Sequence, residues 1–133
     1  MYNKTTMKFI RSGVPIAVIL IVILACGPER NVRKGDRYLA LGEYFDAADQ
    51  FKRAYSKTPV KQRAERGMIA LKLAGCYARI NMAPKAVAAY RNAVRFGNIS
   101  AEDRLLFARQ LLKNGLYREA AEVFGNVLDS LSD

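Results

Sequence analysis

Residues 42–54 read GEYFDAADQFKRA, a pattern that occurs three times in this chain of 133 residues. The two other copies are NMAPKAVAAYRNA at residues 81–93 and GLYREAAEVFGNV at residues 115–127. In each copy a turn residue precedes an alanine, and an aromatic residue follows that alanine four positions later. The alanines are Ala47, Ala86 and Ala120, at spacings of 39 and 34 residues. Self-similarity at such a period is typical of a protein that stacks one supersecondary unit.

Small and aromatic side chains recur at helical spacing around these copies. Small residues at 35, 74 and 108 precede the small residues at 47, 86 and 120. Because two helices approach closely only where side chains are short, we expect each pair to meet inside a helical hairpin. Aromatic residues at 38, 51, 77, 90 and 124 would fill the gaps on either side. The predicted helices span residues 29–41, 44–57, 61–80, 83–96, 100–113 and 117–131.

Four local signals mark the ends of these helices. Ser100 and Asp103 form a capping-box pattern, with Asp in the place of Glu. Pro84 suits a first helical position, and Pro59 prevents the preceding helix from continuing. Gly97 follows the last apolar residue of its helix, where we expect a left-handed cap.

The three units resemble the tetratricopeptide repeat, whose period is 34 residues. The matching positions are Gly35, Tyr38, Ala47, Phe51, Ala54 and Pro59 in the first unit, Leu73, Ala74, Tyr77, Ala86, Tyr90 and Ala93 in the second, and Phe107, Ala108, Leu111, Ala120 and Phe124 in the third, where Val127 replaces the last Ala. The resemblance implies an all-α, right-handed solenoid of three hairpins and six helices, with units at about 28–61, 67–100 and 101–133. Five extra residues separate the first two units, and we expect them in a lengthened helix start around residues 61–65.

The N-terminal residues have the composition of an export signal. Lys4, Lys8 and Arg11 precede an uncharged, mainly apolar run at residues 13–25. A secretory signal needs a basic start and about 7–15 apolar residues, whereas a membrane-spanning helix needs roughly 20. The sequence therefore predicts a signal peptide at residues 1–25, with translation starting at Met1 or at Met7.

The end of that run, Ile23-Leu24-Ala25-Cys26, resembles a bacterial lipobox. The resemblance implies cleavage before Cys26 and acylation of its sulfur, with a short tether at residues 26–30 and the repeat domain at residues 31–133. Two acyl chains anchor a protein far more firmly than one. Since Gly27 replaces the Asp that retains many such lipoproteins at the inner membrane, we expect the periplasmic face of the outer membrane. An uncleaved signal anchor, or an ordinary signal with an incidental Cys26, are the alternatives.

The sequence offers few groups for catalysis. It has no histidine, glycine-rich phosphate loop or nucleophile elbow. Glu119 and Glu122 lie beside Arg118 on a helix face that we expect to be solvated. Cys76 lies in an apolar helical stretch, and it has no disulfide partner if Cys26 is acylated. We therefore expect no enzyme activity, no cofactor, no metal and no small-molecule substrate.

The charge of the exported part bears on its partners. Residues 26–133 carry 19 basic and 12 acidic side chains, a net charge of +7. A positive field favours anionic partners such as lipid headgroups and acidic protein surfaces. Export argues against nucleic acid, which leaves a protein or peptide of the cell envelope as the expected partner, besides the membrane itself.

In the tetratricopeptide family the first helix of each unit lines a concave groove. The resemblance implies a partner-binding surface made of Asp36, Leu39, Leu71, Lys72, Arg79, Leu105, Arg109 and Lys113. That set is an apolar strip with a basic end, which suits an amphipathic helix or an extended peptide carrying acidic residues.

A narrower resemblance concerns residues 35–44, GDRYLALGEY, which follow the tether. They are similar to the opening of Bacteroidota outer-membrane lipoproteins that carry these repeats before a β-propeller and an OmpA-like domain, one of them associated with type IX secretion. The expected function is thus a lipid-anchored scaffold in secretion or envelope assembly. The alternative is a signal-anchored inner-membrane protein that holds exported chains as a chaperone does. We also expect a partner or a further domain to cover the last helix, because solenoids usually end in a polar cap.

Overall fold

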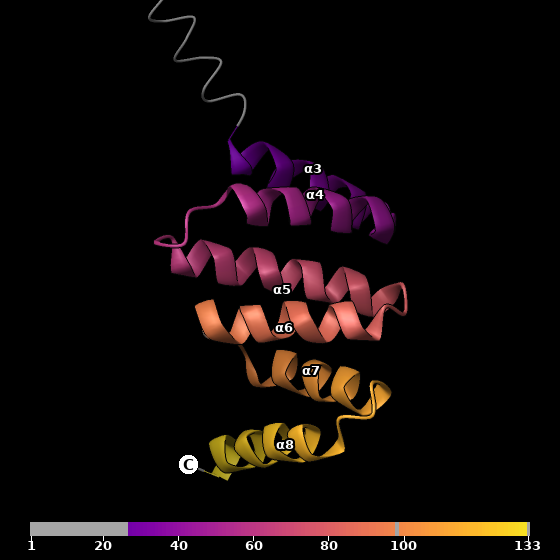
Figure 1. The fold of residues 1–133 in the computed structure, drawn as a ribbon, viewed down its shortest axis with the longest axis vertical. Coiled ribbons are helices and arrows are strands. Elements are labelled where there is room, and N and C mark those ends of the chain that lie inside the picture. The colour runs from indigo at the N-terminus through magenta and orange to yellow at the C-terminus, as the bar shows by residue number, and fades with distance from the viewer. Residues whose placement is uncertain (1–26, 98, 133) are drawn as a thin grey trace, which may run out of the picture.

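The computed structural model describes residues 27–97 and 99–132, and every regular element in that part is an α-helix. The helices are α3 (Pro28–Ala40), α4 (Tyr44–Lys57), α5 (Arg63–Arg79), α6 (Ala83–Phe96), α7 (Ala101–Lys113) and α8 (Tyr117–Ser132) (Figure 1). The six predicted helices are confirmed, with ends that agree to within two residues. The predicted signal segment and Cys26 lie outside the described residues. None of the described helices is long and apolar enough to cross a membrane.

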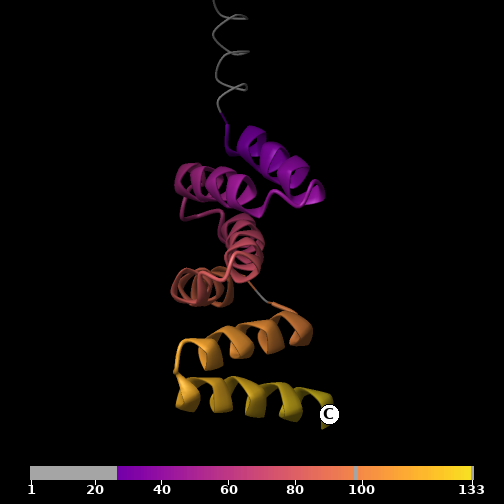
Figure 2. The same cartoon turned by 90° about the vertical axis from the view of Figure 1, so that its right-hand side faces the viewer.

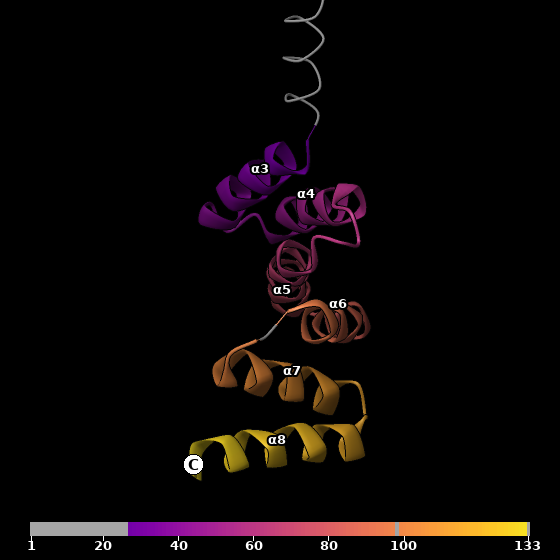
Figure 3. The same ribbon diagram turned by 90° about the vertical axis from the view of Figure 1, so that its left-hand side faces the viewer.

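The helices form three antiparallel hairpins, α3–α4, α5–α6 and α7–α8, stacked along one axis (Figure 1). Each helix packs against the next one in the chain, and its own axis runs across the stack. Successive hairpins are rotated about the long axis: where α5 and α6 are seen almost end-on, α7 and α8 run across the view (Figures 2 and 3). The arrangement is the helical-hairpin repeat expected from the sequence.

The three turns inside the hairpins are built alike. Each contains one residue in the left-handed region, with φ of 76° at Gly42, 57° at Asn81 and 73° at Gly115. The amide after each of these residues donates to a carbonyl five residues earlier, at 2.9 Å in all three turns. This bond satisfies a carbonyl that the end of a helix would otherwise leave without a partner. Glycine and asparagine recur at this position because they tolerate positive φ.

The core consists of small residues packed against aromatic rings. All six paired small residues are buried, namely Gly35, Ala47, Ala74, Ala86, Ala108 and Ala120. Phe51 is fully buried, and its ring fills the space beside Gly35 so closely that a Cβ there would lie 2.6 Å from a ring carbon. Short side chains thus set the separation of α3 and α4, as the sequence predicts.

The extra residues of the second unit lengthen the start of α5, as expected. The paired small residue lies eleven positions after the first residue of α5, against seven positions in α3 and α7. Directly after the added turn, α5 crosses the end of α6 at Gly67 and Gly97, where a Cβ on Gly67 would lie 2.8 Å from the Gly97 Cα. The predicted left-handed cap at Gly97 is wrong, because its φ of −144° is extended. The close crossing depends on Gly67, since a Cβ on Gly97 would lie 3.4 Å from its nearest neighbour, which is an ordinary contact.

Other end signals are confirmed. The Ser100 hydroxyl accepts a hydrogen bond from the Asp103 amide at 3.1 Å and donates one to the Asp103 carboxylate at 2.7 Å. Pro84 lies in the first turn of α6. Arg66, which the sequence did not single out, donates to the carbonyls of Tyr55 and Thr58 at 3.2 and 2.5 Å, and so caps the end of α4 from α5.

Candidate docking groove

An open groove of about 320 Å³ runs between the first helices of the three hairpins. Its lining comes from five helices and is mostly apolar or aromatic: Leu39 of α3, Tyr44 of α4, Leu71, Lys72, Gly75 and Arg79 of α5, Tyr90 of α6, and Asp103 and Leu106 of α7. Because α5 supplies the largest share of the lining, it forms the floor, and α3 and α7 form the two walls.

Half of the sequence-predicted surface meets in this groove. Leu39, Leu71, Lys72 and Arg79 all line it. Asp36 on α3 accepts a hydrogen bond at 2.6 Å from the Lys72 ammonium on α5, so it lies beside the groove and neutralises that cation. The first two units thus bring their predicted residues together.

The position of Arg79 depends on Gly75, one turn earlier on α5. The Arg79 guanidinium folds back to donate to the Gly75 carbonyl at 3.1 Å and lies 5.3 Å from the centre of the Tyr44 ring. A Cβ on Gly75 would come within 3.2 Å of the same guanidinium. Glycine at this position therefore leaves room for the guanidinium close to the helix backbone, where it stacks near the ring of Tyr44.

Tyr90 of α6, which lines the groove, packs against Phe107 of α7. Their rings stack with centroids 5.5 Å apart, and both side chains are buried. Burial raises the pKa of the Tyr90 hydroxyl above its ordinary value of 10.0; Asp103 raises it further, and Arg79 lowers it. The Tyr90 hydroxyl is therefore harder to ionise than that of an exposed tyrosine, and as a neutral phenol it is able to donate a hydrogen bond.

The third unit differs from the prediction. Leu105, Arg109 and Lys113 are exposed on α7 but lie outside the groove lining, to which α7 contributes Asp103 and Leu106 instead. The prediction carried positions over from α5 by repeat register, whereas the third hairpin is rotated relative to the second (Figures 2 and 3). Leu106 could have been found because it lies 34 positions after Lys72, one repeat period, and Asp103 because it lies three residues before Leu106 on the same helix face.

The fixed charges decide what the groove attracts. Lys72 is paired with Asp36, and Asp103 is engaged by its own helix cap. Within the described residues, Arg79 forms no ion pair with a carboxylate. The expected basic end of the groove thus reduces to one cation at Arg79, beside an apolar surface of leucine and tyrosine.

Two other depressions have a different character. One, of about 340 Å³, lies between α4 and the turn from α5 to α6, and an Asp49–Arg53 ion pair at 2.9 Å occupies part of its lining. The other is a shallow surface at the start of α8. Farther along α8, Leu128 and Leu131 are 67 % and 72 % exposed, so in this structure no described element covers that face.

Cys76 is fully buried in the core, as the sequence predicts. Burial raises the pKa of its thiol above the ordinary value of 9.0, and Arg79 opposes the shift. In the part of the chain that the structure describes, no three His, Cys, Asp or Glu side chains gather closely enough to hold a metal ion. The groove lining is mainly apolar and aromatic, and Arg79 is its one cation without a carboxylate partner among the described residues.

No protein-family model and no curated protein sequence matches this chain. Membership of the tetratricopeptide family is therefore a proposal, and it is supported by the three repeated hairpins and by the small residues at their helix contacts.

Proposed function

We propose that this chain is a non-enzymatic docking scaffold of the tetratricopeptide type, anchored to a bacterial envelope membrane through an acylated Cys26. The groove on α3, α5 and α7 would hold a segment of a protein partner. The observation that carries the proposal is the combination of leucine walls with a single guanidinium, Arg79, that has no carboxylate partner in the described chain.

That combination favours one kind of ligand. Leu39, Leu71 and Leu106 would bury apolar side chains of an amphipathic helix or an extended peptide. A carboxylate on the same segment would lie against Arg79, because a planar guanidinium binds carboxylates at two points. Tyr90 also lines the groove, and its hydroxyl is a further donor for that carboxylate or for a backbone carbonyl.

The membrane assignment derives from the sequence of residues 1–26. The proposal places the chain at the periplasmic face of the outer membrane, in a secretion or envelope-assembly machine of the type IX kind. Mass spectrometry of the N-terminus of the native protein tests the anchor. A diacylglyceryl Cys26 is expected, whereas an intact Met1 or Met7 would favour a signal-anchored inner-membrane protein that holds exported chains.

Site-specific crosslinking in living cells tests the groove. A photoreactive amino acid at Leu71, on the groove floor, should capture one discrete partner. The same group at Val94, which is 50 % exposed on α6 outside the groove, is the matched control and should capture none. Capture from Val94 alone, or equal capture from both positions, would refute the assignment of the groove as the docking site.

A further inference from the structure

The outer face of α3 is a continuous strip of cations. The four basic residues of this helix are exposed and spaced i, i+3, i+4 and i+7: Arg30, Arg33, Lys34 and Arg37. At about 100° per residue these positions fall within an arc of roughly 100° on the helix surface. Gly35, which packs on Phe51 of α4, points to the opposite side. The strip therefore faces away from the stack.

No acidic residue interrupts this strip. Glu29 and Asp36 are the acidic residues of α3, and both fall outside the basic arc by helical geometry. Asp36 is turned to Lys72 on α5. The side chains of Arg33, Lys34 and Arg37 form no hydrogen bond or ion pair with any residue in 27–97 or 99–132. Their charge is thus available to an external anion.

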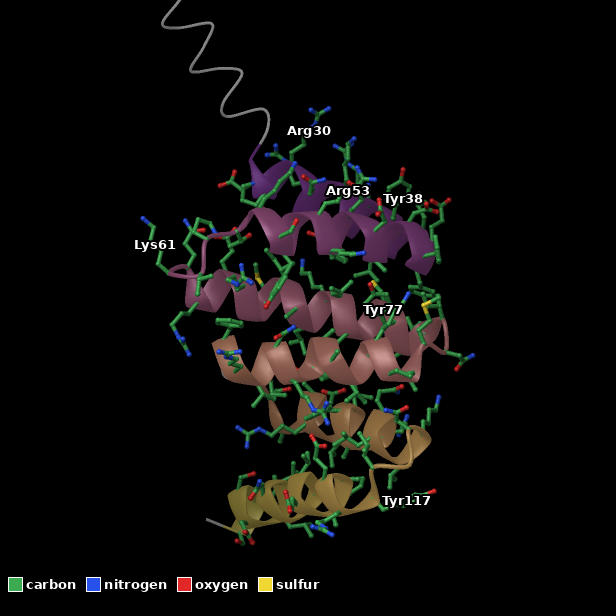
Figure 4. The ribbon with its side chains drawn as sticks, viewed as in Figure 1. Arg30, Tyr38, Arg53, Lys61, Tyr77 and Tyr117 are labelled. Atoms are coloured by element: carbon green, nitrogen blue, oxygen red, sulfur yellow. The ribbon has the colours of Figure 1, made fainter. Side chains whose placement is uncertain are left out.

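The place of α3 in the fold leaves this strip uncovered. It is the first helix of the stack and lies at one end of it, packed on α4 (Figure 1). Figure 4 shows Arg30 extending from α3 away from the other helices. The stack therefore presents one basic end surface to the surroundings.

We propose that this basic face lies flat on the anionic lipid headgroups of the membrane that anchors the chain. The inference rests on the proposed anchor at Cys26. Helix α3 begins at Pro28, two positions after that cysteine, and two residues span at most about 7 Å. The basic helix therefore starts at the membrane surface, and phosphate groups of acidic phospholipids are the anions nearest to it.

Only a flat orientation of α3 brings Arg33, Lys34 and Arg37 close to the lipid headgroups at the same time. A helix of 13 residues is about 20 Å long, whereas charges are screened beyond about 8 Å at physiological salt. If α3 stood upright, Arg37 would lie outside the range of the headgroups. Lying flat, Arg33, Lys34 and Arg37 all reach them.

This docking orients the whole scaffold. The helices run across the long axis of the stack (Figure 1), so a flat α3 directs that axis away from the membrane. The groove on α5 and α7 then opens sideways into the periplasm, and α8 lies farthest from the lipid. The basic face thus holds the anchored chain in one orientation at the membrane.

A single-tryptophan reporter tests this orientation in the full-length, acylated chain. The sequence holds no tryptophan, so Leu41→Trp places one reporter, the near reporter, at the end of α3, at a side chain that is 71 % exposed. Leu131→Trp places another, the far reporter, on α8, where the side chain is 72 % exposed. Energy transfer to a dansyl lipid is measured in vesicles of phosphatidylcholine, with and without phosphatidylglycerol.

Transfer from the near reporter is expected to rise with phosphatidylglycerol and to fall at high salt, while transfer from the far reporter stays low. Arg33→Gln, Lys34→Gln and Arg37→Gln together should abolish that rise. Each cation contributes about fivefold to the docking equilibrium, so three contribute on the order of 100-fold. The matched control is Arg109→Gln, Lys113→Gln and Arg118→Gln, which removes the same charge from exposed positions near the other end and should leave the rise intact.

The possible outcomes distinguish the proposed lipid anchor at Cys26 from the proposed docking of the basic face of α3. A chain that leaves the vesicles overturns both. A chain that stays with them but shows the same near-reporter transfer without phosphatidylglycerol, or loses transfer equally in the control triple variant, overturns the docking alone. Retention of near-reporter transfer in the α3 triple variant overturns it as well, and would leave the basic face to an acidic protein.

Discussion

The ammonium of Lys72 on α5 lies 2.6 Å from the carboxylate of Asp36 on α3, which ties the first hairpin to the second beside the groove. The two side chains are 31 % and 43 % exposed, so water still screens the pair. Lys72 also lies 5.7 Å from the centre of the Phe51 ring. The pair therefore sets the charge of the groove more than it sets the stability of the fold.

A double-mutant cycle tests that division of roles. Asp36→Asn, Lys72→Met and the double variant should give a coupling free energy below about 1 kcal/mol in urea unfolding, because exposed pairs are worth little. Asp36→Asn should nevertheless strengthen binding of an acidic groove ligand, since it frees the Lys72 charge. Unchanged or weaker ligand binding by Asp36→Asn would contradict the electrostatic account of the groove.

Glycine at position 35 should be essential for the approach of α3 to α4. Gly35→Ala places a Cβ 2.6 Å from the Phe51 ring and is expected to lower the free energy of unfolding by about 1–3 kcal/mol. Gly125→Ala is the control, because no atom lies within 4 Å of the place that its Cβ would take in α8. That change should stabilise the helix by about 0.5–1 kcal/mol. Equal effects of the two substitutions would mean that packing at Gly35 is not the cause.

Arg66 should stabilise the junction between the first two hairpins. Its guanidinium donates to the Tyr55 and Thr58 carbonyls and lies 4.1 Å from the Tyr55 ring centre and 5.1 Å from that of Phe96. Arg66→Ala is expected to cost about 2–3 kcal/mol.

Two controls accompany that measurement. Arg66→Lys keeps the charge but loses the planar stacking, so it should recover less than half of the lost free energy. Arg118→Ala, at an exposed position of α8, should change stability by less than about 0.5 kcal/mol. Full recovery by lysine would show that charge alone accounts for the role of Arg66.

The fold should lose stability as the pH rises above about 9. Burial raises the pKa of Cys76 from 9.0 and that of Tyr90 from 10.0. The unfolded chain releases these protons at the ordinary values while the folded chain keeps them, so unfolding becomes easier with rising pH. Each such group contributes up to about 1.4 kcal/mol per pH unit once its unfolded form is ionised.

Urea unfolding between pH 7 and pH 10 measures this slope. Cys76→Ala and Tyr90→Phe remove one group each and should flatten the alkaline limb. An identical slope in both variants and the parent chain would show that other groups govern it.

The fold was predictable because the repeated sequence pattern marks the start and the contact face of each hairpin. Alanines such as Ala47 and Ala86, five residues after a left-handed turn residue, fix where hairpins begin and which faces meet. Gly97 was misjudged because the signal for a left-handed cap is local, whereas the extended backbone of Gly97 lies against Gly67, 30 residues earlier. Contacts of that kind leave no periodic trace in a sequence.

The groove was predictable only where the hairpins keep the same register. Leu39, Leu71 and Arg79 follow from repeat positions on α3 and α5. Leu106 also follows, since it lies 34 positions after Lys72, but Asp103 does not, because its place depends on how far the third hairpin is rotated. That rotation is a matter of tertiary packing between α6 and α7, which the repeat pattern does not describe.

Binding of the captured partner to charge-reversed variants tests the central claim most directly. Arg79→Glu reverses the one groove cation that lacks a carboxylate partner among the described residues, and Arg109→Glu makes the same change on α7 outside the groove. Calorimetric titration should show an affinity at least about tenfold weaker for Arg79→Glu, a loss of about 1.4 kcal/mol, and an unchanged affinity for Arg109→Glu. Equal affinities of Arg79→Glu and the parent chain would contradict docking in this groove.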